Sequence, residues 1–213
     1  MKINNFNASV GNTFIIAEIG NNHNGSYELA VEMIDQAISA GANCVKFQMR
    51  TLEEVYRKRS INGSGEDLGT EYVVDLLKRF ELSKEEHQNL FEYCSLKNIT
   101  YMCTPWDHLS LAFLEDLNVP AYKVASADLT NIPLIELLIK TKKPLILSTG
   151  MSTTEEIKFT AKLLKDANAN FIFLHCNSTY PAPTADINLS WIKELKKIHP
   201  HVGYSGHERG INI

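Results

Sequence analysis

Short apolar segments alternate along the chain with segments whose apolar side chains recur at helical spacing. The apolar runs have the length of buried strands and span 13–18, 43–48, 99–104, 121–126, 144–148, 170–176 and 202–205. Helical patterns lie between them, from Ser26 to Gly41 and at 84–97, 109–117, 134–140, 154–167 and 189–199. Ser26, Ser83 and Asp107 stand where N-caps are expected, because short polar side chains accept hydrogen bonds from the free N–H groups of a first turn. The pattern predicts seven strands, each but the last followed by a helix.

Strict alternation of strands and helices predicts a parallel sheet covered by helices. An open doubly wound sheet and a closed (β/α)8 TIM barrel both fit it. No G-x-G-x-x-G motif follows the first strand, so the fingerprint of a dinucleotide-binding open sheet is missing. The barrel is favoured by polar residues at nearly every carboxyl strand end, since only a barrel brings all these ends to one site. They are Glu18, Lys46, Gln48, Thr104, Ser126, Asp128, Ser148, Ser178, Ser205 and His207.

The strand count predicts a (β/α)8 barrel truncated after its seventh strand. We interpret residues 1–213 as one catalytic barrel domain, incomplete at its C-terminus, and expect the chain to be part of a longer protein. A barrel without its eighth strand has two open edges, which natural proteins seldom leave uncovered. Residues 49–70 break the alternation with a long charged segment that contains Asn62-Gly63-Ser64-Gly65. A substrate lid and a solvated insertion fit this segment equally well.

The composition mainly serves to exclude some classes of protein. The 213 residues are 44% hydrophobic and 22% charged with a net charge of −4, which is typical of a globular protein and unlike a nucleic-acid binder with a basic stripe. No apolar run reaches the roughly 18 residues of a membrane span, and the polar N-terminus has no signal-peptide segment, so we expect a cytoplasmic protein. The four cysteines form no C-x-x-C pair, and we interpret them as core packing.

Two charged residues at neighbouring strand ends are the first candidates for chemistry. Glu18 ends an otherwise apolar strand, where a carboxylate is costly unless a partner compensates it. Lys46 ends the next strand and can pair with Glu18 or hold an anionic substrate. A lone strand lysine also often extends to solvent. A helix-capping turn accounts for the following Asn24 and Ser26 but not for Glu18.

Hydroxyl side chains follow three further strands, in the segments 123–128, 148–152 and 204–208. Each segment alone fits a turn followed by a helix cap. Together with Lys123 they describe a pocket for a phosphate or carboxylate, which binds hydroxyl, backbone N–H and ammonium groups. His207 is a candidate metal ligand, general base or packed core histidine. By itself it favours packing, because neither His23 nor His175 has ligand spacing with it.

Five motifs together resemble the N-acetylneuraminate synthase family in order and spacing. They are Ile16 to Gly25 (IAEIGNNHNG), Val45 to Gln48 (VKFQ), Tyr122 to Ser126 (YKVAS), Leu147 to Met151 (LSTGM) and Gly203 to Glu208 (GYSGHE). The family includes legionaminate and pseudaminate synthases and SpsE-like proteins of surface polysaccharide synthesis. The resemblance runs from Thr13 to the end of the chain.

The resemblance implies a (β/α)8 enzyme, a transferase of sialic acid biosynthesis. Its members join phosphoenolpyruvate to the aldehyde of an open-chain amino sugar such as N-acetylmannosamine, release phosphate and form a nine-carbon 2-keto sugar acid. The resemblance also implies a divalent cation, Mn²⁺ with Mg²⁺ or Co²⁺ as alternatives, which polarises the aldehyde oxygen. In the implied reaction the methylene carbon attacks the aldehyde, water adds, and the adduct expels phosphate.

Carried over residue by residue, the resemblance implies four groups of site residues. Glu18 and Asp128 match carboxylates near the reacting centre, and His207 matches one of two metal-binding histidines, the other of which belongs to a later strand. Gln48 and Tyr180 match sugar-binding positions. The family's phosphoenolpyruvate-binding positions match Lys46, Thr104, Lys123, Ser126, Ser148, Ser178 and Ser205. We also count Lys46 as catalytic. Where many bacterial members have Gly-Ser-Gly-Glu, residues 125–128 read Ala-Ser-Ala-Asp, which shortens the carboxylate by one methylene and bears on the identity of the sugar.

The family architecture adds a C-terminal antifreeze-like domain, which in the dimer lends an arginine to the partner's sugar site. We find neither that domain nor the barrel's end in the chain, and expect a homodimer of the full-length protein. Two other functions stay open. One is an inactive fragment or pseudoenzyme that binds only an anion, and the other is an aldolase-type barrel with Lys46 or Lys123 as Schiff-base nucleophile. We expect no nucleic acid and no membrane as partner.

Overall fold

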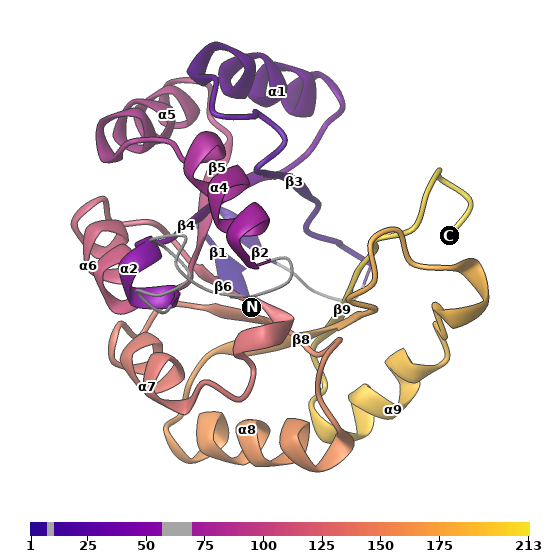
Figure 1. Ribbon diagram of the computed structural model, residues 1–213. Coiled ribbons are helices and arrows are strands. Elements are labelled where there is room, and N and C mark those ends of the chain that lie inside the picture. The colour runs from indigo at the N-terminus through magenta and orange to yellow at the C-terminus, as the bar shows by residue number, and fades with distance from the viewer. Residues whose placement is uncertain (8–10, 57–69) are drawn as a thin grey trace. The chain divides into compact units, whose positions relative to one another are not determined.

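A computed structural model describes residues 1–7, 11–56 and 70–213 of the chain (Figure 1). The chain divides into two compact units, one of residues 8–120 and one of residues 1–7 together with 121–213. We call them the N-terminal unit and the C-terminal unit. In each, parallel strands alternate with helices, as the sequence pattern predicts.

The N-terminal unit contains the parallel strands β3 (Ile16–Gly20), β4 (Cys44–Met49) and β5 (Thr100–Pro105), in that order. Its helices are α1 (Tyr27–Ser39), α2 (Leu52–Val55), α4 (Thr70–Phe80), α5 (Lys84–Leu96) and α6 (His108–Asp116). Ser26, Ser83 and Asp107 cap α1, α5 and α6 as predicted, each accepting a hydrogen bond from a first-turn backbone N–H. Helices α1 and α5 lie side by side against this sheet (Figure 1).

The C-terminal unit contains the parallel strands β6 (Tyr122–Val124), β7 (Leu145–Ser148), β8 (Phe171–Cys176) and β9 (Val202–Ser205), in that order. Between them lie α7 (Ile132–Lys140), α8 (Thr154–Asp166) and α9 (Trp191–Ile198), with short 3₁₀ turns at η1 (Ser126–Asp128) and η2 (Thr184–Asp186). All seven predicted strands and all six predicted helices are present, with ends shifted by a few residues.

The sequence pattern does not predict the antiparallel hairpin of β1 (Lys2–Ile3) and β2 (Phe6–Asn7). The chain turns through Asn4, which has a left-handed φ of 50°. Ile3 is only 2% exposed and belongs to the C-terminal unit. Strands of two residues are too short to show alternation, so burial of Ile3 is the first sign of this element.

Part of the segment 49–70, predicted as a loop, is helical. Helix α2 occupies Leu52–Val55, and α4 begins at Thr70 and continues to Phe80. Residues 57–69 lie outside the described residues. The alternative of a lid or an insertion therefore stays a prediction.

Parallel pairing places the predicted site residues of the N-terminal unit side by side. Glu18 on β3 pairs in register with Lys46 on β4, and Gln48 on β4 pairs with Thr104 on β5. Side chains alternate along a strand, so Lys46 and Gln48 point to the same face of β4. The strand ends therefore form one row of polar side chains.

The core of the N-terminal unit contains a buried histidine, His87 of α5. It is 2% exposed, shares a 2.8 Å hydrogen bond with the Tyr101 hydroxyl through Nδ1, and meets Phe47 edge-on. Phe47 stacks on Tyr101. Burial lowers the pKa of His87 to about 4, because the imidazolium loses its hydration, and the nearby His23 acts in the same direction. His87 is therefore neutral in the fold at pH 5, whereas an unfolded chain binds a proton there.

We expect the protein to lose stability as the pH falls below the unfolded-state histidine pKa of 6.5 toward the folded value of about 4. Between pH 7 and pH 5 the contribution of His87 to the free energy of unfolding falls by about 2 kcal/mol. His87→Leu removes the titrating group and should flatten this dependence, although it lowers stability at pH 7 by leaving the Tyr101 hydroxyl unpaired. Urea unfolding at both pH values measures the change.

The exposed His201 provides the control for this experiment. His201→Gln should keep the pH dependence of the wild type. An equal loss of stability in His87→Leu and wild type would show that His87 is already charged in the fold or is not buried.

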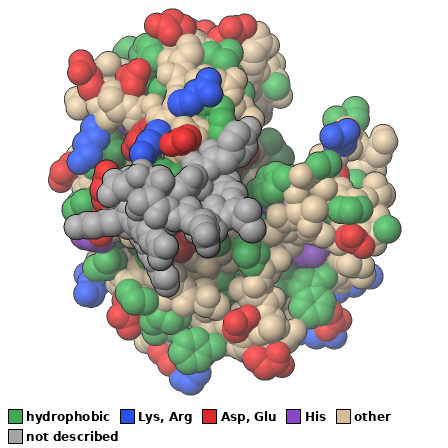
Figure 2. Space-filling view, viewed as in Figure 1, with side chains coloured by type: hydrophobic (Ala, Val, Ile, Leu, Met, Phe, Trp, Pro, Cys, Tyr) green, Lys and Arg blue, Asp and Glu red, His purple; other side chains and the backbone are tan. Residues whose placement is uncertain are grey.

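Within the described residues, no helix combines the length and apolar character needed to cross a lipid bilayer. Lys and Arg side chains are scattered among Asp and Glu on the face shown in Figure 2.

All four cysteines are buried and free of disulfides, as predicted for core packing.

Candidate active site

The carboxyl ends of β3, β4 and β5 bring together three predicted site residues. The Lys46 ammonium group forms an ion pair with the Glu18 carboxylate and donates a 3.2 Å hydrogen bond to Thr104 Oγ1. Lys46 is 5% exposed, whereas the Glu18 side chain is 48% exposed. The contact expected between Glu18 and Lys46 is therefore present. An anion that binds here would meet a fixed ammonium group and a hydroxyl.

Gln48 lies on the same face of β4 as Lys46 and contacts Arg50, a residue that the sequence analysis did not predict. Arg50 donates a 2.5 Å hydrogen bond from Nη2 to Gln48 Oε1, and its guanidinium carbon lies 4.8 Å from the centre of the Trp106 ring. Arg50 follows β4, in the segment predicted as a loop, so no strand-end pattern pointed to it. The available signal was its spacing of two residues from Gln48 and four from Lys46, which continues one face of the strand.

The C-terminal unit forms a second cluster of predicted site residues around Gly150. Ser126 Oγ accepts a 3.2 Å hydrogen bond from the Gly150 backbone N–H and lies 3.7 Å from Cys176 Sγ. A side chain at position 150 is excluded, since a Cβ there would lie 2.7 Å from Ser178 Oγ and 2.8 Å from the Cys176 carbonyl oxygen. Glycine thus lets the loop after β7 lie close against the end of β8. In this position its backbone N–H donates to Ser126 Oγ.

Two buried polar atoms of this cluster, Asp128 Oδ2 and Ser178 Oγ, have no hydrogen-bond partner among the described residues. The other carboxylate oxygen of Asp128 accepts a 3.0 Å hydrogen bond from Asn131. Burial raises the pKa of Asp128, although the Asn131 hydrogen bond and the charge of Lys123 act in the opposite direction. Lys123 is itself buried, and its ammonium group donates a 2.8 Å hydrogen bond to the Val124 carbonyl. Unpaired buried polar atoms are costly, so this cluster is suited to a ligand that would pair with them.

His207, just beyond β9, is held between Tyr180 and the end of β8. Its Nε2 shares a 2.8 Å hydrogen bond with the Tyr180 hydroxyl, and the two rings stack with centroids 3.9 Å apart. Its Nδ1 lies 2.5 Å from the Asn177 carbonyl oxygen, and Cys176 Sγ lies 3.8 Å from both ring nitrogens. Burial opposes the charged imidazole, but Cys176 and the Asn177 carbonyl outweigh it and raise the pKa of His207.

Cys176 contacts two predicted site residues, Ser126 and His207, which its interpretation as core packing did not predict. Burial acts to raise the pKa of its thiol, but the hydrogen bonds to His207 and Ser126 outweigh burial and lower it. The two remaining predicted residues of this unit, Ser148 and Ser205, end β7 and β9. Ser205 pairs in register with Cys176.

The described residues do not by themselves form a metal site. Both ring nitrogens of His207 already have partners, and no group of three or more His, Cys, Asp or Glu side chains in the described ranges could hold a metal ion. One imidazole binds a divalent cation weakly, because affinity grows with the number of ligands in a fixed geometry. The Mn²⁺ expected from the resemblance therefore stays a prediction.

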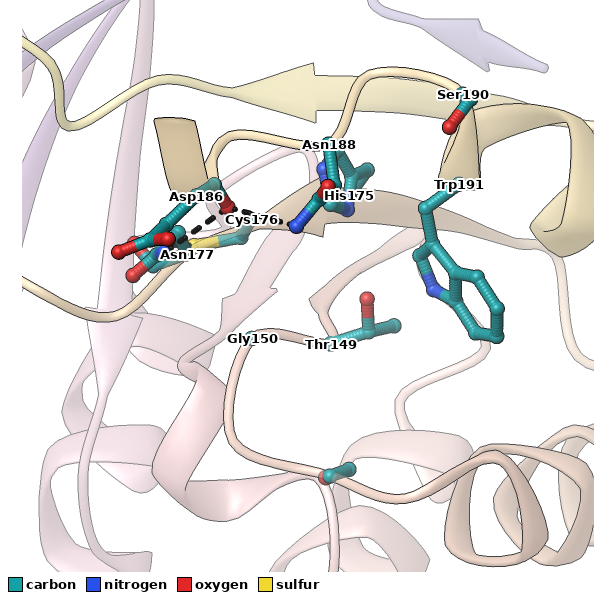
Figure 3. A pocket seen from close by; sticks show the side chains of 10 residues that line it. Thr149, Gly150, His175, Cys176, Asn177, Asp186, Asn188, Ser190 and Trp191 are labelled. Atoms are coloured by element: carbon teal, nitrogen blue, oxygen red, sulfur yellow. Dashed lines mark hydrogen bonds between the residues drawn. The ribbon is translucent and has the colours of Figure 1, made fainter. Parts of the chain in front are cut away.

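A cavity of about 420 Å³ lies beside the second cluster (Figure 3). Two of its lining residues, Asn177 and Asn188, donate hydrogen bonds of 3.2 and 3.1 Å to the Asp186 carbonyl oxygen. Its lining consists of Thr149, Gly150, Ser152, His175, Cys176, Asn177, Asp186, Asn188, Ser190 and Trp191. None of the site residues predicted from sequence lines this cavity. The clusters at the strand ends are a better candidate for the active site than this cavity. They contain the lysine, carboxylate and hydroxyl side chains that are suited to catalysis.

Comparison with known proteins agrees with the motifs at these strand ends. A profile of the NeuB family matches residues 33–213. The chain belongs to the NeuB family.

This NeuB-family chain is similar to two curated synthases and to a solved structure. It is 37% identical over 205 residues to the N-acetylneuraminate-9-phosphate synthase of Homo sapiens, covering 94% of this chain and 57% of that protein. It is 37% identical over 215 residues to the N,N'-diacetyllegionaminic acid synthase of Legionella pneumophila, covering 94% of this chain and 59% of that protein. The N-acetylneuraminic acid (sialic acid) synthetase of Leptospira borgpetersenii, solved in complex with citrate, matches with a TM-score of 0.82 and 38% identity over 93% of this chain and 66% of that chain.

These similarities confirm the family resemblance and the predicted (β/α)8-barrel fold class, and the described residues include seven parallel strands of such a barrel. The chain spans somewhat more than half the length of the two curated relatives.

Proposed function

We propose that the protein is a sialic-acid-synthase-type transferase that condenses phosphoenolpyruvate with the aldehyde of an N-acetylmannosamine-like amino sugar. A carbon–carbon bond forms between the methylene carbon of phosphoenolpyruvate and the aldehyde carbon. Water adds to the carbon that bears the phosphate, and the bond from that carbon to the bridging oxygen breaks. The products are inorganic phosphate and a nine-carbon 2-keto sugar acid.

The observation that carries this proposal is the cluster of Lys123, Ser126, Ser178 and Asp128 in the C-terminal unit. It combines a buried ammonium group with hydroxyls and with two buried polar atoms that lack partners among the described residues. Phosphate and carboxylate groups bind such donors strongly, because charge-assisted hydrogen bonds are about twice as strong as neutral ones. Phosphoenolpyruvate carries both groups.

The proposed roles follow the family resemblance residue by residue. Glu18 and Asp128 handle protons or orient the attacking water, with Lys46 as the charged partner of Glu18. Gln48 and Tyr180 hold the amino sugar. Phosphoenolpyruvate is held by Lys46, Thr104, Lys123, Ser126, Ser148, Ser178 and Ser205. The ion pair of Lys46 with Glu18 supports this assignment, because a buried cation and a half-exposed carboxylate lie side by side on the neighbouring strands β4 and β3.

Isotope labelling tests the proposed bond cleavage. With phosphoenolpyruvate that carries heavy oxygen at the bridging position, we expect the label to leave with inorganic phosphate, because water adds to the carbon and the carbon–oxygen bond then breaks. Mass spectrometry of the phosphate and of the sugar acid measures its distribution. Label retained in the sugar acid would mean phosphorus–oxygen cleavage and a different mechanism.

Borohydride trapping separates the proposed reaction from aldolase chemistry. An aldolase would form a Schiff base between a carbonyl substrate and Lys46 or Lys123, and borohydride would fix it as a stable adduct. We expect no adduct on either lysine when the protein is treated with both substrates and borohydride. A mass increase on a peptide containing one of them would favour the aldolase.

A further inference from the structure

Three side chains on one face of β4 and its extension, Lys46, Gln48 and Arg50, each make polar contacts. Lys46 contacts Glu18 and Thr104, whereas Gln48, two residues further on, accepts a hydrogen bond from Arg50. The donor of this 2.5 Å hydrogen bond, Arg50 Nη2, belongs to a charged guanidinium, and hydrogen bonds with a charged partner are stronger than neutral ones. Arg50 is thus bound to a neutral predicted substrate-binding residue.

The surroundings of Arg50 hold its guanidinium in place. The group lies over the Trp106 ring, and the backbone next to both residues is tied together, because the Trp106 N–H donates to the Met49 carbonyl and the Thr51 N–H donates to Asp107. No carboxylate of the described ranges lies within ion-pair distance of Arg50. The residue is therefore not held there by a salt bridge within that part of the chain.

The contact with Arg50 decides which end of the Gln48 amide faces away from it. Arginine has only donors, so the atom that meets Nη2 is the acceptor Oε1, and the donor Nε2 is left for another partner. Gly20 shows where Nε2 lies, since a Cβ on Gly20 would be 3.4 Å from Gln48 Nε2 and 3.2 Å from Glu18 Oε1. The donor end of Gln48 is thus directed to the side of the Glu18 carboxylate.

We propose that Arg50 is a positioning residue that fixes Gln48 as a hydrogen-bond donor, so that the site selects an acceptor sugar with a carbonyl or hydroxyl oxygen facing Gln48 Nε2. This inference rests on the proposed function, in which Gln48 holds the sugar. Without Arg50 the amide can rotate and present either end, which weakens binding of that oxygen. Arg50 acts through Gln48 and does not itself touch the sugar.

A double-mutant cycle tests this in the full-length protein. Arg50→Met should raise the KM for N-acetylmannosamine about ten-fold, the size expected for losing one well-placed hydrogen bond, with the KM for phosphoenolpyruvate unchanged. Gln48→Met should have a similar effect. The variant with both changes should be no worse than Gln48→Met, because Arg50 acts only through Gln48. Multiplied effects in the double variant would mean that Arg50 acts independently, and would overturn the proposal.

Conservative variants separate positioning from a general structural role. Arg50→Lys keeps a charged donor and should recover part of the affinity that Arg50→Met loses. Gln48→Glu keeps the acceptor for Arg50 but removes the donor, so it should raise the KM for the sugar although the Arg50 contact is strengthened. The exposed Arg79, also in the N-terminal unit, is the matched control, and Arg79→Met should leave both KM values unchanged. Circular dichroism verifies that each variant is folded.

The side-chain amide signals of Gln48 provide a measurement that does not depend on activity. In a ¹⁵N–¹H spectrum this NH₂ pair is identified by its loss in Gln48→Glu, and in Arg50→Met we expect it to move to the position of free glutamine amides. An unchanged pair in Arg50→Met would contradict the positioning role. If the wild type forms no sugar acid, the proposed function fails, whereas the amide signals still decide whether Arg50 holds Gln48.

Discussion

Asp128→Asn is expected to lower the kcat of the condensation by about a hundred- to ten-thousand-fold, the usual loss when a proton-handling side chain is removed. The KM values should change far less, because the amide fills the same space. Asp128→Glu should recover most of the activity, since it keeps a carboxylate. Steady-state release of phosphate measures these rates. Asp166→Asn, on the surface of α8, is the control and should behave as the wild type.

The pH dependence of Asp128→Asn provides a second measurement. Burial raises the pKa of Asp128, so the acidic limb of the wild-type kcat profile should lie above the usual carboxyl value of 3.8, and activity should fall as the pH drops through the raised pKa. This limb should be missing in Asp128→Asn.

Although Asp128→Asn should lower the activity, it should not lower the stability of the protein at neutral pH. A carboxylate with a raised folded-state pKa costs stability at neutral pH, and this cost disappears as the pH falls through the folded pKa. Asp128→Asn should therefore unfold no more easily than the wild type at pH 7. An active Asp128→Asn protein, or one that loses activity only by unfolding, would remove Asp128 from the chemistry.

Lys123→Met is expected to lower kcat/KM for phosphoenolpyruvate by about ten- to 150-fold. The buried ammonium group lies near Asp128, and loss of a charge-assisted hydrogen bond to a ligand is worth about 1.5–3 kcal/mol. Methionine keeps the aliphatic length of the buried side chain, so the fold should survive. The KM for the amino sugar should stay within about two-fold of the wild-type value.

Calorimetric titration with phosphoenolpyruvate measures the same loss without turnover. It therefore also applies if the protein binds the anion but does not react, as the pseudoenzyme alternative requires. The control is Lys140→Met at the exposed end of α7, which should bind as the wild type does. Unchanged affinity and rate in Lys123→Met would place Lys123 outside the anion site.

Local patterns allowed much of this fold to be predicted. Ser83, predicted as an N-cap, begins α5 by accepting a hydrogen bond from the backbone N–H three residues further on, and the apolar run that ends in Lys46 and Gln48 marks a buried strand. Both signals depend on neighbours in sequence, which the chain itself keeps together. The hairpin around Asn4 was missed because its strands of two residues have no period to recognise.

By itself the sequence determined the order of strands and helices, the polar character of the strand ends and membership of a synthase family. It also placed Glu18 beside Lys46, because consecutive parallel strands are usually neighbours. Only the tertiary structure decided that Arg50 holds Gln48, that Cys176 lies against His207, and that Asp128 keeps one oxygen unpaired among the described residues. These contacts depend on side-chain rotamers and on the packing of segments up to dozens of residues apart, which no local pattern of residue types specifies.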